Sequence, residues 1–166
     1  MDMLQIFGLQ FVLSLVVFSL LAAWRFAPWL DRQALPEALF WLALPHAFRH
    51  VGLVFLVPGV VDPALPGSFS AAAGYGDLAA GLLAILSLIA LRQRWVIALL
   101  LVWLLNIVGL VDLANALRQV ETVPYFQAAW YIPTFVVPML LVTHVMMVTR
   151  LVRAMTGTAR DARSKA

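Results

Sequence analysis

Five long apolar segments constrain the fold of this chain more than any other feature. Short polar or proline-containing segments separate them, and each reaches the roughly 20 mostly apolar residues that a helix needs to cross a bilayer. The sequence therefore predicts an all-α integral membrane protein, a bundle of five transmembrane helices forming a single domain over residues 1–153. The predicted spans are about 4–26, 35–61, 72–91, 95–117 and 128–152.

The composition excludes several other classes of protein. Hydrophobic residues make up 64% of the 166 residues and charged residues 11%, whereas soluble domains are about 45–50% apolar and about 25% charged. A globule of this size has too little interior to bury so many apolar side chains. A soluble domain, a disordered chain and a nucleic-acid-binding protein are therefore excluded. The absence of cysteine excludes disulfides and thiolate metal sites.

The basic residues predict an orientation, because lysine and arginine accumulate on the cytoplasmic side of membrane proteins. With the C-terminus inside, only Arg118 falls on the opposite side. We therefore expect the N-terminus outside, and residues 154–166 as a basic, disordered cytoplasmic tail. The compact, cysteine-free composition suggests a bacterial inner membrane. The basic residues assigned to the inner side are Arg25, Arg32, Arg92, Arg94, Arg150, Arg153, Arg160, Arg163 and Lys165.

Polar residues inside the predicted spans are the candidates for a functional site. A charged group at the bilayer centre costs about 2.5–3.5 kcal/mol on insertion scales, so it usually faces the bundle interior and marks function. The rise of about 1.5 Å per residue divides the candidates by depth and predicts a mid-membrane polar pocket opening toward the outer face. The middle group is His46, Arg49, His50, Asn106 and His144, and the outer group is Asp77, Asp112 and Asn115.

Helical spacing predicts which of these side chains converge. In an α-helix, His46 and His50 are separated by four residues and share a face, with Arg49 beside it. The fourth span carries a row at three-residue spacing whose glycine would let another helix or a ligand approach. The members of this row are Asn106, Gly109, Asp112 and Asn115.

Arg49 needs a carboxylate partner inside the membrane. Asp112 is the first candidate and Asp77 the second, because the long arginine side chain can reach several ångströms toward either. Two interpretations remain open. The pair is either a structural ion pair that fixes two helices, or part of a pocket in which Arg49 anchors an anionic or carbonyl group.

The three histidines also admit several interpretations. His46 and His144 fall at similar depth on different helices, as the axial ligands of a haem b would. Together with His50 they could instead ligate a metal, although the sequence has no H-E-x-x-H motif. A third interpretation is that the histidines form hydrogen bonds or exchange protons, and a fourth is that they are purely structural.

These candidates support a small membrane protein that binds a small or lipid-like ligand, with proton transfer as an available chemistry. The competing hypotheses are a redox subunit that binds haem b or quinone, and an accessory or assembly subunit of a larger membrane complex. A transporter is less favoured, because the chain shows no internal repeat. The expected partners are the lipid bilayer, a small-molecule or lipid-like ligand, or a membrane complex, and no nucleic acid.

Overall fold

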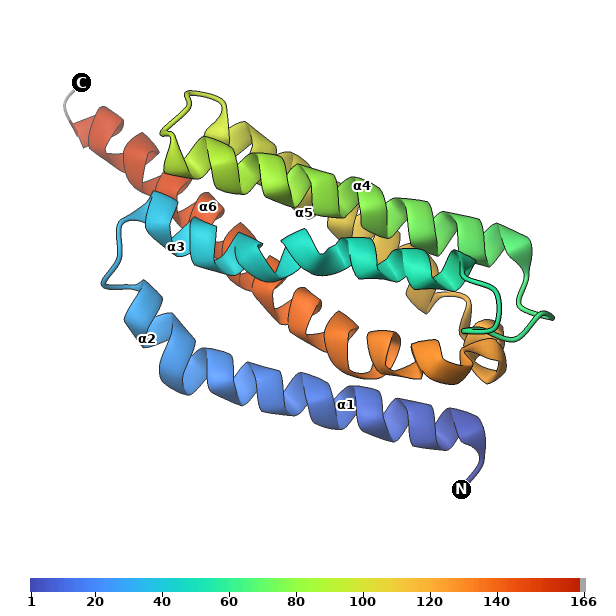
Figure 1. The fold of residues 1–166 in the computed structure, drawn as a ribbon. Helices are drawn as coiled ribbons and strands as arrows, with labels where there is room; N and C mark the ends of the chain where they lie inside the picture. The colour runs from blue at the N-terminus through green and yellow to red at the C-terminus, as the bar shows by residue number, and fades with distance from the viewer. Residues whose placement is uncertain (165–166) are drawn as a thin grey trace.

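The computed structural model describes the backbone of residues 1–164 and the side chains of residues 1–156. Within this part of the chain the fold is all-helical, with no strand. Five helices are long and apolar enough to cross a membrane, as the sequence predicted. Figure 1 shows them as one elongated bundle, with the two termini at opposite ends. The five cover Met3–Leu30, Leu35–Leu56, Gly67–Arg92, Ala98–Leu117 and Gln127–Thr156.

Several of these spans are built from more than one type of helix. The first contains α1 (Met3–Leu21), η1 (Ala22–Phe26) and α2 (Ala27–Leu30), and the second α3 (Leu35–Ala43) and η2 (Leu44–Leu56). The third and fourth are the regular helices α4 (Gly67–Arg92) and α5 (Ala98–Leu117). After η3 (Val120–Tyr125), the fifth follows as η4 (Gln127–Trp130), η5 (Ile132–Val136) and α6 (Val137–Ser164).

The helix α6 includes most of the segment predicted as a tail. Its backbone is helical up to Ser164, beyond the point where the tail was expected to begin. The predicted disorder of residues 165–166 lies outside the described residues, and so do the side chains of Arg160, Arg163 and Lys165.

Prolines explain where the helices change type. A proline lacks an N–H group, and its ring clashes with the carbonyl four residues earlier. Pro28 and Pro138 each follow a wider π-helical turn, η1 and η5, which contains that earlier carbonyl. Pro45 stands at the start of η2, where the second span changes from α-helix to 3₁₀-helix. This span ends at Leu56, earlier than predicted, and Gly59 in the loop after it has a φ of +82° that favours glycine.

The 3₁₀-helix η2 is unusually long. It has 13 residues, whereas most 3₁₀ segments end after three or four. A 3₁₀-helix has 3.0 residues per turn and rises about 2.0 Å per residue, so η2 spans about 26 Å. Glycines on α4 allow η2 to pack closely: a Cβ at Gly74 would lie 3.1 Å from Leu56, and one at Gly81 would lie 3.2 Å from the backbone nitrogen of His50.

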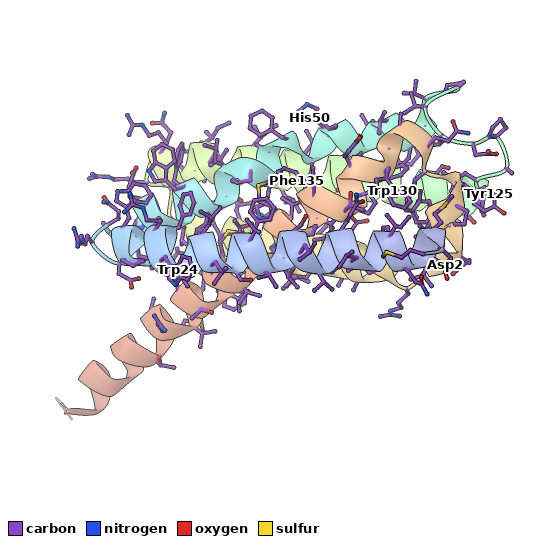
Figure 2. The ribbon with its side chains drawn as sticks, turned by 90° about the horizontal axis from the view of Figure 1, so that it is seen from below. Asp2, Trp24, His50, Tyr125, Trp130 and Phe135 are labelled. Carbon is purple, nitrogen blue, oxygen red and sulfur yellow. The ribbon has the colours of Figure 1, made fainter. Side chains whose placement is uncertain are left out.

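The first helix lies at the edge of the bundle. Figure 1 shows α1 beside α6 and η5 and away from α4. None of its residues is buried. The indole of Trp130 donates a hydrogen bond of 2.6 Å to Gln10, and Phe18 packs edge-on against Phe135. Figure 2 shows Trp130 and Phe135 beside this helix.

Two of the three buried apolar clusters among the described residues lie toward opposite ends of the bundle. One includes Leu39, Leu105 and Met147, toward the end of the bundle that contains the α4–α5 turn. The other includes Phe55 and Phe126, toward the end that contains the N-terminus. Most of the buried polar side chains, among them His46, Arg49, Asp77, Asn106 and His144, lie along the helices between these two clusters. The fold therefore encloses a polar layer near the middle of the spans.

Candidate functional site

The 3₁₀ geometry of η2 decides which of its side chains enter this polar layer. With three residues per turn, positions three apart share a face. The buried face of η2 accordingly carries His46, Arg49, Gly52 and Phe55.

His50 lies on the opposite side of η2. It is exposed, its Nδ1 lies 2.9 Å from the carbonyl oxygen of Ala47, and Figure 2 shows it at the edge of the bundle. The expectation that His46 and His50 share a face is therefore wrong, because it assumed an α-helix.

Arg49 is the centre of the buried polar layer. Its guanidinium donates from Nε to Asp77 over 2.7 Å and from Nη2 to Asp112 over 2.5 Å. Its Nη1 donates to the carbonyl oxygen of Gly109 over 3.3 Å. The Arg49 side chain is only 1% exposed. Both predicted carboxylate partners thus bind Arg49 at the same time, and this Arg49–Asp77–Asp112 triad joins η2, α4 and α5.

Glycines make room for the triad. A Cβ at Gly52 would collide with Asp77, and one at Gly76 would collide with Asp112. At Gly109, a Cβ would lie 2.6 Å from His144 Nε2 and 2.8 Å from Arg49 Nη1. Real Cβ atoms essentially never approach other heavy atoms to less than 3.0 Å. The close fit of the polar groups therefore depends on these glycines.

Two histidines lie in contact beside the triad. The rings of His46 and His144 have centroids 4.1 Å apart and planes inclined by 57°, and both side chains are fully buried. His144 Nδ1 lies 2.9 Å from Asn106 Oδ1, and His46 Nε2 lies 2.9 Å from the hydroxyl of Thr143. The remaining nitrogens, His46 Nδ1 and His144 Nε2, have no hydrogen-bond partner among the described residues.

The neighbouring groups indicate which ring nitrogens carry hydrogen. The amide nitrogen of Asn106 donates to the carbonyl of Val102, so its oxygen is left to accept from His144 Nδ1–H. The Thr143 hydroxyl donates its single hydrogen to backbone carbonyls of its own helix, so its oxygen accepts from His46 Nε2–H. When each ring carries a single hydrogen, the two nitrogens without a partner, His46 Nδ1 and His144 Nε2, are therefore both hydrogen-bond acceptors.

The histidines do not form the metal site that was one interpretation of their spacing. His50 lies away from the other two, and no group of three or more His, Cys, Asp or Glu side chains in the described residues could hold a metal ion. His46 and His144 do not fit a haem either, because their rings contact each other and leave no space for a porphyrin between them.

The row on α5 is brought into the site only in part. Asn106, Gly109 and Asp112 contact the cluster, but Asn115 is exposed and does not. Three residues turn an α-helix by about 300°, so each step of three rotates the row back by about 60°. By the third step, the side chain of Asn115 is on the opposite side of α5 from Asn106.

One polar contact was absent from the predicted site. The sequence places Thr143 directly before His144 in an apolar span, but this spacing alone does not show that its hydroxyl binds His46 on another helix. A polar residue next to a buried histidine was the available signal.

Two cavities reach the triad. The lateral cavity, of about 430 Å³, lies between η2 and the η5–α6 segment; Phe48 and Val51 border it on the exposed side. Its lining is apolar except for Arg49 and Asp77. A second cavity, of about 50 Å³, touches Asp77 and Asp112 and extends toward the α5–η3 connection. The larger opening is therefore on the flank of the bundle and not at its end.

Comparison with known proteins gives a family but no activity. No curated protein and no solved structure matches the chain. One family model, described as a domain of unknown function (DUF8737), matches residues 6–152, which contain the whole polar cluster and most of all five spans. The chain therefore belongs to the DUF8737 family.

Proposed function

We propose that this protein lies in a cell membrane, of the bacterial inner-membrane type, with its N-terminus outside and its C-terminus in the cytoplasm. The five apolar helices and the termini at opposite ends of the bundle support this placement. The arginines at positions 25, 32, 92 and 94 lie toward the end of the bundle opposite the N-terminus, where the positive-inside rule expects them.

Within the membrane, we propose that the protein binds a lipid-like molecule in the lateral cavity. The single observation that carries this proposal is the cavity's composition: apolar walls that end at the Arg49–Asp77 ion pair. Ligand sites are typically concave and mostly apolar, with a few polar groups that fix orientation. An opening on the flank of the bundle suits a molecule that enters from the bilayer.

The hydrogen bonds already made by Arg49 and Asp77 indicate which polar group a ligand could present to them. All three nitrogens of Arg49 already donate to groups of the chain, and two carboxylates compensate its charge, which disfavours the role of anion anchor that the sequence suggested. Asp77 uses only Oδ1 toward Arg49, and its side chain remains 12% exposed. The triad carries two carboxylates for one guanidinium. A ligand with a hydrogen-bond donor, such as a hydroxyl or an ammonium group, fits this site.

The histidine pair lies next to the proposed pocket. Its two unpartnered nitrogens lie in the same polar layer as the triad, but neither ring lines the lateral cavity. Proton transfer between a bound ligand and this pair would therefore have to pass through the triad, and binding does not require it.

The experiment that tests ligand binding compares two matched substitutions in the triad. Asp77→Asn and Asp112→Asn each remove one carboxylate from Arg49, but only Asp77 lines the lateral cavity. The variants are purified from membranes, and native mass spectrometry measures the co-purified mass. We expect the wild type and Asp112→Asn to retain a bound molecule that Asp77→Asn loses. Equal retention in all three proteins, or no bound mass in the wild type, would contradict the proposal.

An accessory subunit of a membrane complex is the second candidate. It is favoured by the binding of all three Arg49 nitrogens to groups of the chain, as in a structural ion cluster, and by the exposed apolar surface of α1. In that case both Asp→Asn variants would lower the abundance of the protein equally. Cross-linking from residues of α1 in the membrane would then capture the same partner protein in every repeat.

A further inference from the structure

A large cleft lies outside the site described above. It has a volume of about 1010 Å³ and separates the η1–α2 segment from α3 and α6. Figure 1 shows α1 and α2 diverging from α3 and α6 in this region. The π-helical turn η1 and Pro28 stand at the point of divergence. We call this opening the arginine cleft, because Arg25 and Arg32 are the charged groups in its lining.

The two arginines have no partner within the described residues. The side chain of neither one forms an ion pair or a hydrogen bond there, unlike that of Arg150 nearby, which binds Asp31 over 2.7 Å. Asp31 is paired with Arg150, and Glu37 accepts a hydrogen bond of 2.8 Å from Trp41 but does not line the cleft. No carboxylate is among the lining residues, so Arg25 and Arg32 give the cleft a net positive charge.

The rest of the lining is apolar and aromatic. Trp24, Trp29 and Trp41 share this lining with the arginines, and the rings of Trp29 and Trp41 pack edge-on with centroids 5.8 Å apart. Tryptophans of this kind lie at the headgroup level of membranes. Deeper in the cleft, the lining includes Val142 and Met146 of α6. The cleft thus combines a cationic, aromatic mouth with an apolar interior.

We propose that the arginine cleft binds one anionic phospholipid, with its phosphate at Arg25 and Arg32 and an acyl chain along α6. This inference rests on the membrane placement proposed above, but not on the ligand of the lateral cavity. Basic pockets between membrane helices on the cytoplasmic side are suited to anionic headgroups. Arginine also binds phosphate with a planar pair of donors. Pro45 and Met139 line both the cleft and the lateral cavity, so the lipid lies directly beside the proposed ligand site.

The test measures which lipid the protein retains. The purified protein is placed in nanodiscs of equal amounts of phosphatidylglycerol and phosphatidylcholine, and native mass spectrometry then identifies the bound lipid. We expect one retained phosphatidylglycerol. An attraction of about fivefold per basic side chain predicts that the double variant Arg25→Gln/Arg32→Gln lowers the preference for phosphatidylglycerol by about 25-fold.

A matched control separates the cleft from general surface charge. Arg92→Gln/Arg94→Gln removes the same charge from the α4–α5 turn at the same end of the bundle, outside the cleft. This control keeps the wild-type preference if the proposal is right. An equal loss in both double variants would overturn it, because the lipid would then respond only to total charge.

A second pair of variants tests the position of the acyl chain. Val142→Trp fills the cleft, whereas Val145→Trp adds the same bulk at an exposed position of α6 outside it. We expect only Val142→Trp to lose the retained lipid, and retention by both would overturn the proposal. Asp77→Asn leaves the cleft intact, so loss of the lateral ligand and loss of the phospholipid are distinguishable results.

Discussion

His46 and His144 contact each other in the centre of the bundle, with ring centroids 4.1 Å apart and no exposure of either side chain. Each ring keeps one nitrogen bonded and one nitrogen without a partner among the described residues. The two bonded nitrogens differ: Nε2 of His46 faces Thr143 on α6, and Nδ1 of His144 faces Asn106 on α5. This difference determines which nitrogen of each ring is left without a partner, Nδ1 in His46 and Nε2 in His144.

The first prediction concerns the tautomers of this pair. We expect the singly protonated rings to carry hydrogen on Nε2 of His46 and on Nδ1 of His144, since Thr143 and Asn106 accept at these positions. Nitrogen-15 NMR of histidine-labelled protein, with each histidine replaced in turn for assignment, measures the tautomers. Identical tautomers at both sites would contradict the hydrogen-bond network.

The second prediction concerns Arg49. Removing one partner of a buried ion pair leaves an uncompensated charge and costs roughly 3–5 kcal/mol. We expect Arg49→Ala to lower the free energy of unfolding by about this amount, since it strands two carboxylates. Arg49→Lys should recover only part of the loss, because a lysine cannot donate in a fork to Asp77, Asp112 and Gly109 together. Denaturant unfolding in detergent micelles measures both variants, and wild-type stability in Arg49→Ala would refute the role of the triad.

The third prediction concerns the glycines that fit around the polar cluster. Gly109→Ala places a methyl group against His144 and Arg49, and overpacking of this kind costs roughly 1–3 kcal/mol. Gly8→Ala is the control, because a Cβ there meets nothing within 4 Å. Within the helix α1, we expect Gly8→Ala to raise stability by roughly 0.5–1 kcal/mol. Thermal unfolding of both variants under the same conditions measures these two changes in stability, which we expect to have opposite signs. Equal changes in the two variants would contradict the described packing.

The fourth prediction concerns orientation, which the absence of cysteine makes simple to measure. Ala64→Cys lies in the loop before α4, and Gln93→Cys lies in the turn after it. We expect a membrane-impermeant maleimide to label Ala64→Cys in intact cells and Gln93→Cys only after permeabilisation. The unsubstituted chain takes no label and serves as the control. The reverse pattern would show the opposite orientation.

The sequence predicted the larger features of this fold well. Five helical spans follow from the length of the apolar segments, and the pairing of Arg49 with Asp112 and Asp77 follows from depth and the need for a counter-charge. These predictions succeed because hydrophobic length and unpaired charge are strong, local constraints.

The details of the site depended on helix type, which the apolar pattern does not specify. His50 was assigned to the site on the assumption of 3.6 residues per turn, but η2 has three per turn and turns it outward. The buried residues of η2 are three apart along the sequence: His46, Arg49, Gly52 and Phe55. This spacing, directly after Pro45, was the available sign of a 3₁₀-helix. The contact between His46 and His144 depends on the packing of two separate helices, so no spacing within one segment could reveal it.

Filling the lateral cavity tests directly whether it holds a molecule. Val136→Trp fills this cavity without changing a member of the triad, and Val145→Trp adds equal bulk to an exposed position of the same span outside it. Both variants are extracted from native membranes, and native mass spectrometry measures the mass bound to each. We predict that Val145→Trp retains the wild-type bound mass and that Val136→Trp loses it. A bound mass that survives in Val136→Trp would contradict the proposed site.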